Sequence, residues 1–190
     1  MHTPWAVNSD LVVPYKPLRG GLNKIQHILR VCLTHPERLL LEPARAKILV
    51  VSKLSDSSNA AWEVWRNSTF LGIIVLDRIT PNIDARLQFV FFDDELASKV
   101  ALLREFVRKC FDEFGFERLT FETPELAQPK RKSGSRGGST EGKLVSFARR
   151  RLGFAYEGGN RAGSRSERAY FDGVQWYDVV RLRLLAGEVL

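Results

Sequence analysis

The stretch from Leu96 to Pro124, LASKVALLREFVRKCFDEFGFERLTFETP, carries the strongest helical pattern in the chain, with a strand directly after it. Its apolar residues recur at steps of three and four, which places them on one face of an amphipathic helix. The residues of this face are Leu96, Val100, Leu103, Val107, Cys110 and Phe114. Gly115 is predicted to close the helix as a C-cap residue, because glycine tolerates a left-handed backbone. Leu119–Glu122 is then predicted to be a strand that stops at Pro124.

The residues before this helix predict antiparallel strands. Trp62–Arg66 alternates in character, and Phe70–Leu76 is apolar and rich in β-branched residues. Asn67 and Ser68 lie between them as a turn, so the three pieces together predict a hairpin. Ala85–Phe92 is a further predicted strand, which leads toward the long helix.

Shorter elements are predicted toward both ends of the chain. Leu11–Tyr15 reads as an opening strand, and the apolar spacing from Leu22 to Leu33 predicts an amphipathic helix. Near the C-terminus, Leu144–Leu152 predicts a short helix that Gly153 ends. Three more strands are expected at Phe154–Tyr156, Ala169–Phe171 and Gln175–Leu185.

Length and composition predict one domain over residues 1–190. The chain is 44% hydrophobic and 11% aromatic, which is enough apolar material for a core. No apolar run approaches the roughly 18 residues that span a bilayer, and no secretory signal begins the sequence. Two cysteines exclude a disulfide scaffold, and with three histidines they make a metal site improbable. We therefore expect no membrane contact and a cytoplasmic location, or a location in the virion if the chain is phage-encoded.

The net charge of +7 is concentrated in one part of the chain. Eleven Lys and Arg residues stand against three Glu residues between positions 128 and 168, giving +8 there and −1 elsewhere. A Gly/Ser-rich insert at 129–142 contains no apolar residue. Such a patch attracts nucleic acid, phosphate or an acidic protein surface, although a solvated loop has the same composition. The residues expected to contact a partner are Lys130, Arg131, Lys132 and Arg136.

Four C-terminal motifs carry a family resemblance. They are Leu152-Gly153-Phe154, Tyr156-Glu157-Gly158, Ala169–Gly173 and Trp176–Val180. Together with the order of the predicted elements, they resemble the GNAT family of acetyl-CoA-dependent N-acetyltransferases, in particular the branch that acetylates ribosomal-protein N-termini. The resemblance covers roughly Trp62 to Leu185. It implies an α+β fold with a mostly antiparallel mixed central sheet flanked by helices.

The resemblance also implies where acetyl-CoA would bind, and this sequence departs from the family there. In the family the strands on either side of the central helix splay apart, pantetheine pairs with the first strand, and a glycine-rich loop holds the pyrophosphate. Here the first strand ends at Phe91 and Phe92, and Asp93-Asp94-Glu95 replaces the glycine-rich loop. These acids suit a helix start, with Asp93 or Asp94 as the cap, but they would repel pyrophosphate. Lys99 is the one nearby positive charge that could offset this repulsion. The resemblance therefore implies a degenerate cofactor site.

Two further positions bear on catalysis. The family's tyrosine proton donor corresponds to Arg149, in the run Arg149-Arg150-Arg151, and arginine cannot supply a proton near neutral pH. Glu122 is a candidate general base, although a strand-end glutamate is more often simply solvated. If acetyl-CoA binds, the residues expected to hold it are Phe91, Phe92, Lys99, Arg149 and Arg150; otherwise no cofactor is expected.

Three hypotheses about function follow. The first is a GNAT-fold protein that has lost acetyl-CoA binding and serves as a protein-binding or assembly module, as a phage virion component or in a homo-oligomer. The second is an N-acetyltransferase that acts on a protein or small-molecule amine and binds phosphate through Lys99 and the arginine run. The third is a non-specific nucleic-acid binder that acts through the basic insert.

Overall fold

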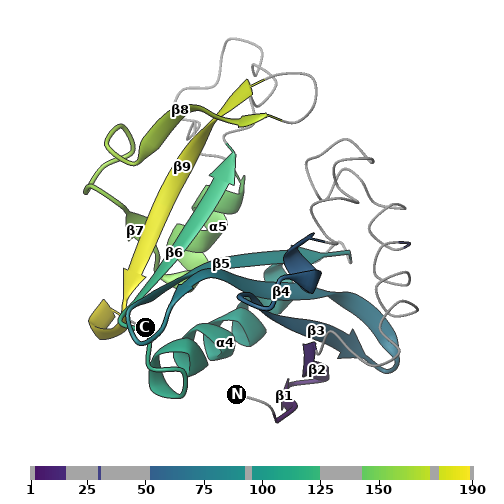
Figure 1. The fold of residues 1–190 in the computed structure, drawn as a ribbon. Coiled ribbons are helices and arrows are strands. Elements are labelled where there is room, and N and C mark those ends of the chain that lie inside the picture. The colour runs from purple at the N-terminus through teal and green to yellow at the C-terminus, as the bar shows by residue number, and fades with distance from the viewer. Residues whose placement is uncertain are drawn as a thin grey trace.

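The computed structural model describes residues 3–15, 30, 52–92, 96–124, 143–171 and 176–188. The strands within these residues form one mixed sheet in the order β1-β2-β3-β4-β5-β6-β9-β7, with β8 also paired to β9 (Figure 1). The described strand pairs are antiparallel except β5 with β6. The predicted α+β class with a mostly antiparallel sheet is therefore confirmed. The strands are β1 (Trp5–Val7), β2 (Asp10–Tyr15), β3 (Ala60–Arg66), β4 (Thr69–Thr80), β5 (Asp84–Phe91), β6 (Arg118–Pro124), β7 (Ala155–Tyr156), β8 (Arg165–Phe171) and β9 (Trp176–Leu185).

The predicted hairpin is the β3–β4 pair. Asn67 and Ser68 have φ values of 45° and 68°, the positive values that a tight turn between twisted strands requires. β4 runs on to Thr80, beyond the predicted end at Leu76, and it is irregular between Asp77 and Thr80. The sequence hides this extension, because the strand continues through charged residues that pair with charges on neighbouring strands.

The sheet opens between β5 and β6. These parallel strands pair only at Asp84 with Arg118, Ala85 with Leu119 and Arg86 with Thr120. β6 instead pairs with β9 along its whole length, so β6 and β9 swing away from β5 and β4 as one unit (Figure 1). The splay that the family resemblance implied is present.

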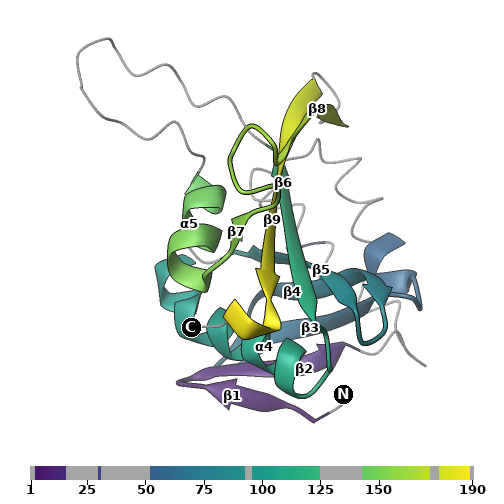
Figure 2. The ribbon, with the colours of Figure 1, turned by 90° about the vertical axis from the view of Figure 1, so that its left-hand side faces the viewer.

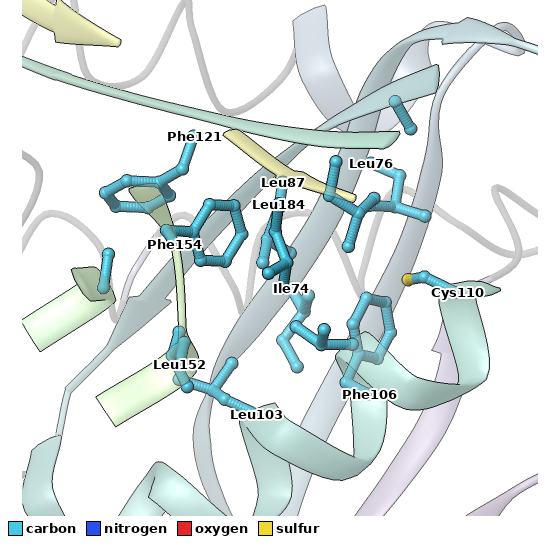
Figure 3. Packing of buried hydrophobic residues seen from close by; sticks show 14 of the residues in the cluster. Ile74, Leu76, Leu87, Leu103, Phe106, Cys110, Phe121, Leu152, Phe154 and Leu184 are labelled. Carbon is cyan, nitrogen blue, oxygen red and sulfur yellow. The ribbon is translucent and has the colours of Figure 1, made fainter. Parts of the chain in front are cut away.

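Two helices cover the same face of the sheet (Figure 2). α4 (Val100–Asp112) places Phe106 edge-on against Trp62 of β3, with ring centroids 4.9 Å apart. α5 (Lys143–Leu152) places Phe147 against Phe89 of β5. Figure 3 shows Leu103 of α4 and Leu152 of α5 pointing into the common core.

The start of the long helix differs from the prediction. A short 3-10 turn, Leu96–Lys99, precedes α4, and Lys99 is the N-cap residue without a side-chain capping hydrogen bond. Asp93 and Asp94, the predicted cap residues, lie outside the described residues. The helix ends at Asp112 with Glu113 as its C-cap residue, two residues before the predicted C-cap Gly115. Gly115 follows with a left-handed φ of 73°.

Other predicted elements differ from the structure or lie outside the described residues. β1 was not expected from the sequence, and β8 begins at Arg165, four residues before the predicted start. The helix predicted at Leu22–Leu33 lies outside the described residues except for Arg30, and the basic insert at 129–142 lies wholly outside them. In the described part of the chain, no helix is long and apolar enough to cross a membrane.

Candidate functional site

Aromatic rings meet across the opening between β5 and β6. Phe89 of β5 stacks on Phe121 of β6, with centroids 5.5 Å apart and an interplanar angle of 21°. Phe147 of α5 lies edge-on to Phe89 at 6.2 Å, and Phe154 lies 6.0 Å from Phe121. All these separations fall in the range in which aromatic pairs attract. The helix-side part of the splay is thus occupied by the protein's own side chains; Figure 3 shows Phe121 and Phe154 within this packing.

The two aromatic residues at the end of β5 also have structural contacts. Phe91 is buried, with 6% of its surface exposed, and lies 5.8 Å from Phe89. Phe92 donates its backbone N–H to the carbonyl of Leu71 at 2.8 Å, and its ring lies 5.9 Å from Phe70. Both predicted cofactor residues therefore extend the packing of the β4–β5 pair.

Lys99 is completely buried. Its Nζ lies 3.4 Å from Oδ2 of Asp10, a buried carboxylate on β2. Arg66 donates to both oxygens of the same carboxylate, at 2.6 and 3.1 Å. The charge of Lys99 is thus directed into the protein, where it joins the β1–β2 hairpin to the start of α4.

The arginine run lies in the last turn of α5. Its three residues are exposed, and the Arg149 guanidinium lies over the ring of Tyr156, 4.3 Å from the centroid. The carbonyl of Arg151 accepts a hydrogen bond from Nε of Arg104 at 2.7 Å. Cations suit the C-terminal end of a helix, where the dipole is negative. Since Lys99 is buried and these arginines are exposed, the structure does not bring them together as one phosphate site.

Glu122 lies on the opposite face of the sheet from the helices, within a cluster of arginines. It accepts hydrogen bonds from Arg86 and from Nε of Arg181, the latter at 2.8 Å, and Nη1 of Arg78 lies 3.4 Å from both its oxygens. Burial raises the pKa of Glu122, but the hydrogen bonds from Arg181 and Arg86 outweigh burial and hold the pKa below its ordinary value. A carboxylate held ionised in this way is a weak general base.

A second carboxylate extends the cluster. Asp77, which is fully buried in β4, is bound by both Nε and Nη2 of Arg86, at 2.7 and 2.8 Å, and by Nζ of Lys53. Burial and the nearby Arg86 and Arg78 charges lower the pKa of Lys53 to about 8. Sequence reasoning missed this network; the signal was a charged residue at the end of the apolar run of β4.

An open cavity of about 360 Å³ lies beside this cluster. It is formed by the outward-facing residues of β4, β5, β6 and β9 and by the turn after β7. Its charged lining residues are Arg78, Asp84, Arg118, Glu122, Glu157 and Arg181. No group of three or more potential metal ligands occurs among the described residues.

The residues predicted to bind a partner, Lys130, Arg131, Lys132 and Arg136, lie outside the described part of the chain.

Comparison with solved structures shows which fold this is. A GCN5-related N-acetyltransferase from Brucella melitensis superposes with a TM-score of 0.64 at 12% identity, over 99% of this chain and 80% of that one. A GNAT-family protein from Chromobacterium violaceum gives 0.65 at 17% identity, over 97% and 92%. A mutant of the spermidine N-acetyltransferase SpeG from Vibrio cholerae gives 0.62 at 14% identity, over 96% of both chains.

No protein-family model matches the sequence, and no similar curated protein is found. The similarity to the solved structures nevertheless shows that the chain has the GNAT acetyltransferase fold, as the resemblance implied.

Proposed function

We propose that this chain is a GNAT-fold protein that does not bind acetyl-CoA and that acts as a protein-binding module. The observation that carries the proposal is the aromatic packing across the splay, where Phe89, Phe121 and Phe147 occupy the space between β5, β6 and α5. Pantetheine could enter there only if these rings moved apart. Their contacts would be lost in that movement, so entry would cost free energy.

A second argument against acetyl-CoA binding concerns the cation that would contact its pyrophosphate. The cation nearest the start of α4, Lys99, is buried and paired with Asp10. Freeing it would leave the Asp10 carboxylate with less compensation inside the protein, which is costly for a buried charge. The binding energy available to a pyrophosphate is reduced by that cost.

One exposed tryptophan, beside three half-buried aromatic residues, supports the binding-module part of the proposal. Trp176, at the start of β9, is 59% exposed and lies against Phe171 of β8, with centroids 5.1 Å apart. On the same hairpin Tyr170 lies 6.3 Å from Tyr177. Aromatic residues are enriched in protein–protein interfaces, where one rigid ring buries a large area.

Calorimetric titration of the 190-residue chain with acetyl-CoA tests the proposal. We expect no saturable heat. A micromolar dissociation constant, equivalent to about −8 kcal/mol, would overturn the proposal. A double variant, Phe89→Ala with Phe147→Ala, separates the two causes of exclusion. Binding gained by this variant assigns the exclusion to the rings, and continued absence of binding assigns it to the missing phosphate site.

The second candidate function is an acetyl-CoA-dependent N-acetyltransferase, and the retained splay favours it. Beyond Arg86 the backbone of β5 has no partner in β6, which leaves that edge available for pairing with a ligand. The test is release of CoA thiol from acetyl-CoA in the presence of polyamine or peptide amines. Under this function, replacing Arg149, Arg150 and Arg151 by Gln should abolish turnover, whereas Arg108→Gln on the exposed face of α4 should not.

A further inference from the structure

The cavity beside Glu122 lies on the face of the sheet that α4 and α5 do not cover. Along β6 the side chains of Arg118, Thr120 and Glu122 line it, while the alternating Leu119 and Phe121 are buried against the helix layer. Figure 2 shows both helices on the other side of the sheet. The cavity is therefore separate from the gap filled by phenylalanine rings.

Among the residues that the structure describes, the ion-paired network around this cavity holds one cation more than it holds carboxylates. Its five cations are Lys53, Arg78, Arg86, Arg118 and Arg181, and its four carboxylates are Asp77, Asp84, Glu122 and Glu157. The surplus cation leaves a net positive charge at the edge of the cavity. A concave site lined by a net positive charge attracts an additional anion.

The surplus cation is Arg78. Its contact with Glu122 measures 3.4 Å to each oxygen, longer than a good charge-assisted hydrogen bond, and its side chain is 65% exposed. The Glu122 oxygens are already occupied by Arg86 and Arg181. The guanidinium of Arg78 therefore borders the cavity with most of its donor capacity unused.

The backbone of Arg78 is held in an unfavourable conformation. Its φ is 49°, in the left-handed region that costs energy for a residue with a Cβ, and it lies within the irregularity between Asp77 and Thr80 of β4. Irregularities of this kind redirect a side chain and recur beside binding sites. Here the effect is to present Arg78 at the cavity.

We propose that this cavity binds the oxyanion group of a small molecule, a carboxylate or a phosphate, with Arg78 as its principal ligand and Arg181 beside it. Thr80 also lines the cavity, and its hydroxyl is a neutral donor, whereas the Thr120 hydroxyl donates to the carbonyl of Ala85 at 3.5 Å.

The behaviour of Lys53 supports a positive potential at this place. Burial is the largest cause of its lowered pKa, and repulsion from Arg86 and Arg78 adds to it; the attraction of Asp56 and Glu122 does not outweigh these effects. A cationic ligand would meet carboxylates that are already engaged by arginines. The proposal is independent of acetyl-CoA binding, because the gap between β5 and β6 is not involved.

The experiment is an anion titration of the 190-residue chain, monitored by NMR and by the midpoint of thermal unfolding. Sodium phosphate and sodium acetate form two arms, and sodium chloride holds the ionic strength constant, so that general screening is removed. We expect saturable binding in at least one arm, and the arm with tighter binding identifies phosphate or carboxylate as the preferred group. Arg78→Gln should weaken that binding at least tenfold. Arg108→Gln, an exposed arginine that is also ion-paired, should titrate as the wild type.

A second variant separates binding from folding. Arg78→Gly removes the guanidinium and relieves the left-handed backbone, so it should fold at least as well as the wild type and still lose anion binding. The proposal is overturned if neither anion shows saturable binding. It is also overturned if the folded Arg78→Gly and Arg78→Gln proteins bind the anion as tightly as the wild type does.

Discussion

At the scale of single residues, the polar face of the sheet is organised around two carboxylates. Glu122 and Asp77 share Arg86; Glu122 also accepts from Arg181, and Asp77 also accepts from Lys53. Strands β4, β5, β6 and β9 and the segment before β3 are thereby joined at one place. The same contacts that make Glu122 a weak base make it a strong point of attachment between the two halves of the splayed sheet.

Replacing Glu122 should destabilise the protein in a pH-dependent way. Glu122→Gln should lower the free energy of unfolding at pH 7 by about 2 kcal/mol, because hydrogen bonds to a charged group are lost. The pKa of Glu122 is lowered in the folded state, so its contribution is complete above the unfolded pKa of about 4.3 and is lost as the pH falls through the folded value. Urea unfolding at a series of pH values measures this. A difference between variant and wild type that persists unchanged in acid would contradict the argument.

Arg78 also affects the charge of Lys53. Since the Arg78 charge helps to lower the pKa of Lys53 to about 8, Arg78→Gln should raise that pKa. The expected direction is upward because a nearby positive charge disfavours protonation of the amine. NMR titration of the lysine side chain measures the pKa, with Arg108→Gln as the control. An unchanged pKa in Arg78→Gln would show that the two charges do not interact.

At the scale of elements, the pairing of β4 with β5 requires a glycine at position 72. A Cβ on Gly72 would overlap the carbonyl oxygen of Val90 and would lie 2.8 Å from Cδ1 of Phe91, so the neighbouring β5 strand leaves no room for a side chain. The register of β3 shifts between Val64 and Trp65, next to this position. The close approach of β4 and β5 thus requires glycine here.

Gly72→Ala should therefore destabilise the β4–β5 pair. The obstructing atoms include backbone, which cannot rotate away, and overpacking of this kind costs about 1–3 kcal/mol. Thermal and chemical unfolding measure the loss. Gly187→Ala is the matched control, since a Cβ there meets nothing within 4 Å. Equal stability of the two variants would mean that β5 moves aside freely.

At the scale of the whole molecule, one sheet supports two different surfaces. On the face that α4 and α5 cover, the residues are apolar and phenylalanine rings pack across the gap between β5 and β6. The other face holds the charged network and the cavity. The end of the β8–β9 pair that carries Phe171 and Trp176 extends beyond the end of β6 (Figure 1), because β6 pairs with β9 only from Val179 onward. Under the two proposals above, a protein partner at the Trp176 end of β9 and a small anion in the cavity would bind at different places.

Deleting Lys130–Thr140 tests the partner-binding role assigned to the basic insert from its sequence. The segment contains no apolar residue whose burial could offset ordering costs, so the melting temperature of the monomer should change little. Association with an acidic partner or a second copy should weaken, most visibly at raised ionic strength. Sedimentation at two salt concentrations measures this. A deletion that lowers the melting temperature of the monomer would show that the insert packs on its own domain.

The sequence by itself determined the order and type of most described elements and the fold class. Apolar periodicity located α4 and α5, and glycines at positions 115 and 153 predicted where they end, because these signals are local. The family resemblance added the splay between β5 and β6, which no local pattern contains.

Only the tertiary structure decided the character of the site. Phe89 and Phe121 are far apart in the chain, and so are Lys99 and Asp10; nothing in either sequence neighbourhood shows that they meet. Glu122 looked like an exposed strand end until β4, β5 and β9 brought Arg78, Arg86 and Arg181 around it. Charge environment and cavity shape depend on which strands lie side by side and in what register. Those non-local pairings arise from the packing of the whole sheet, which local sequence patterns do not specify.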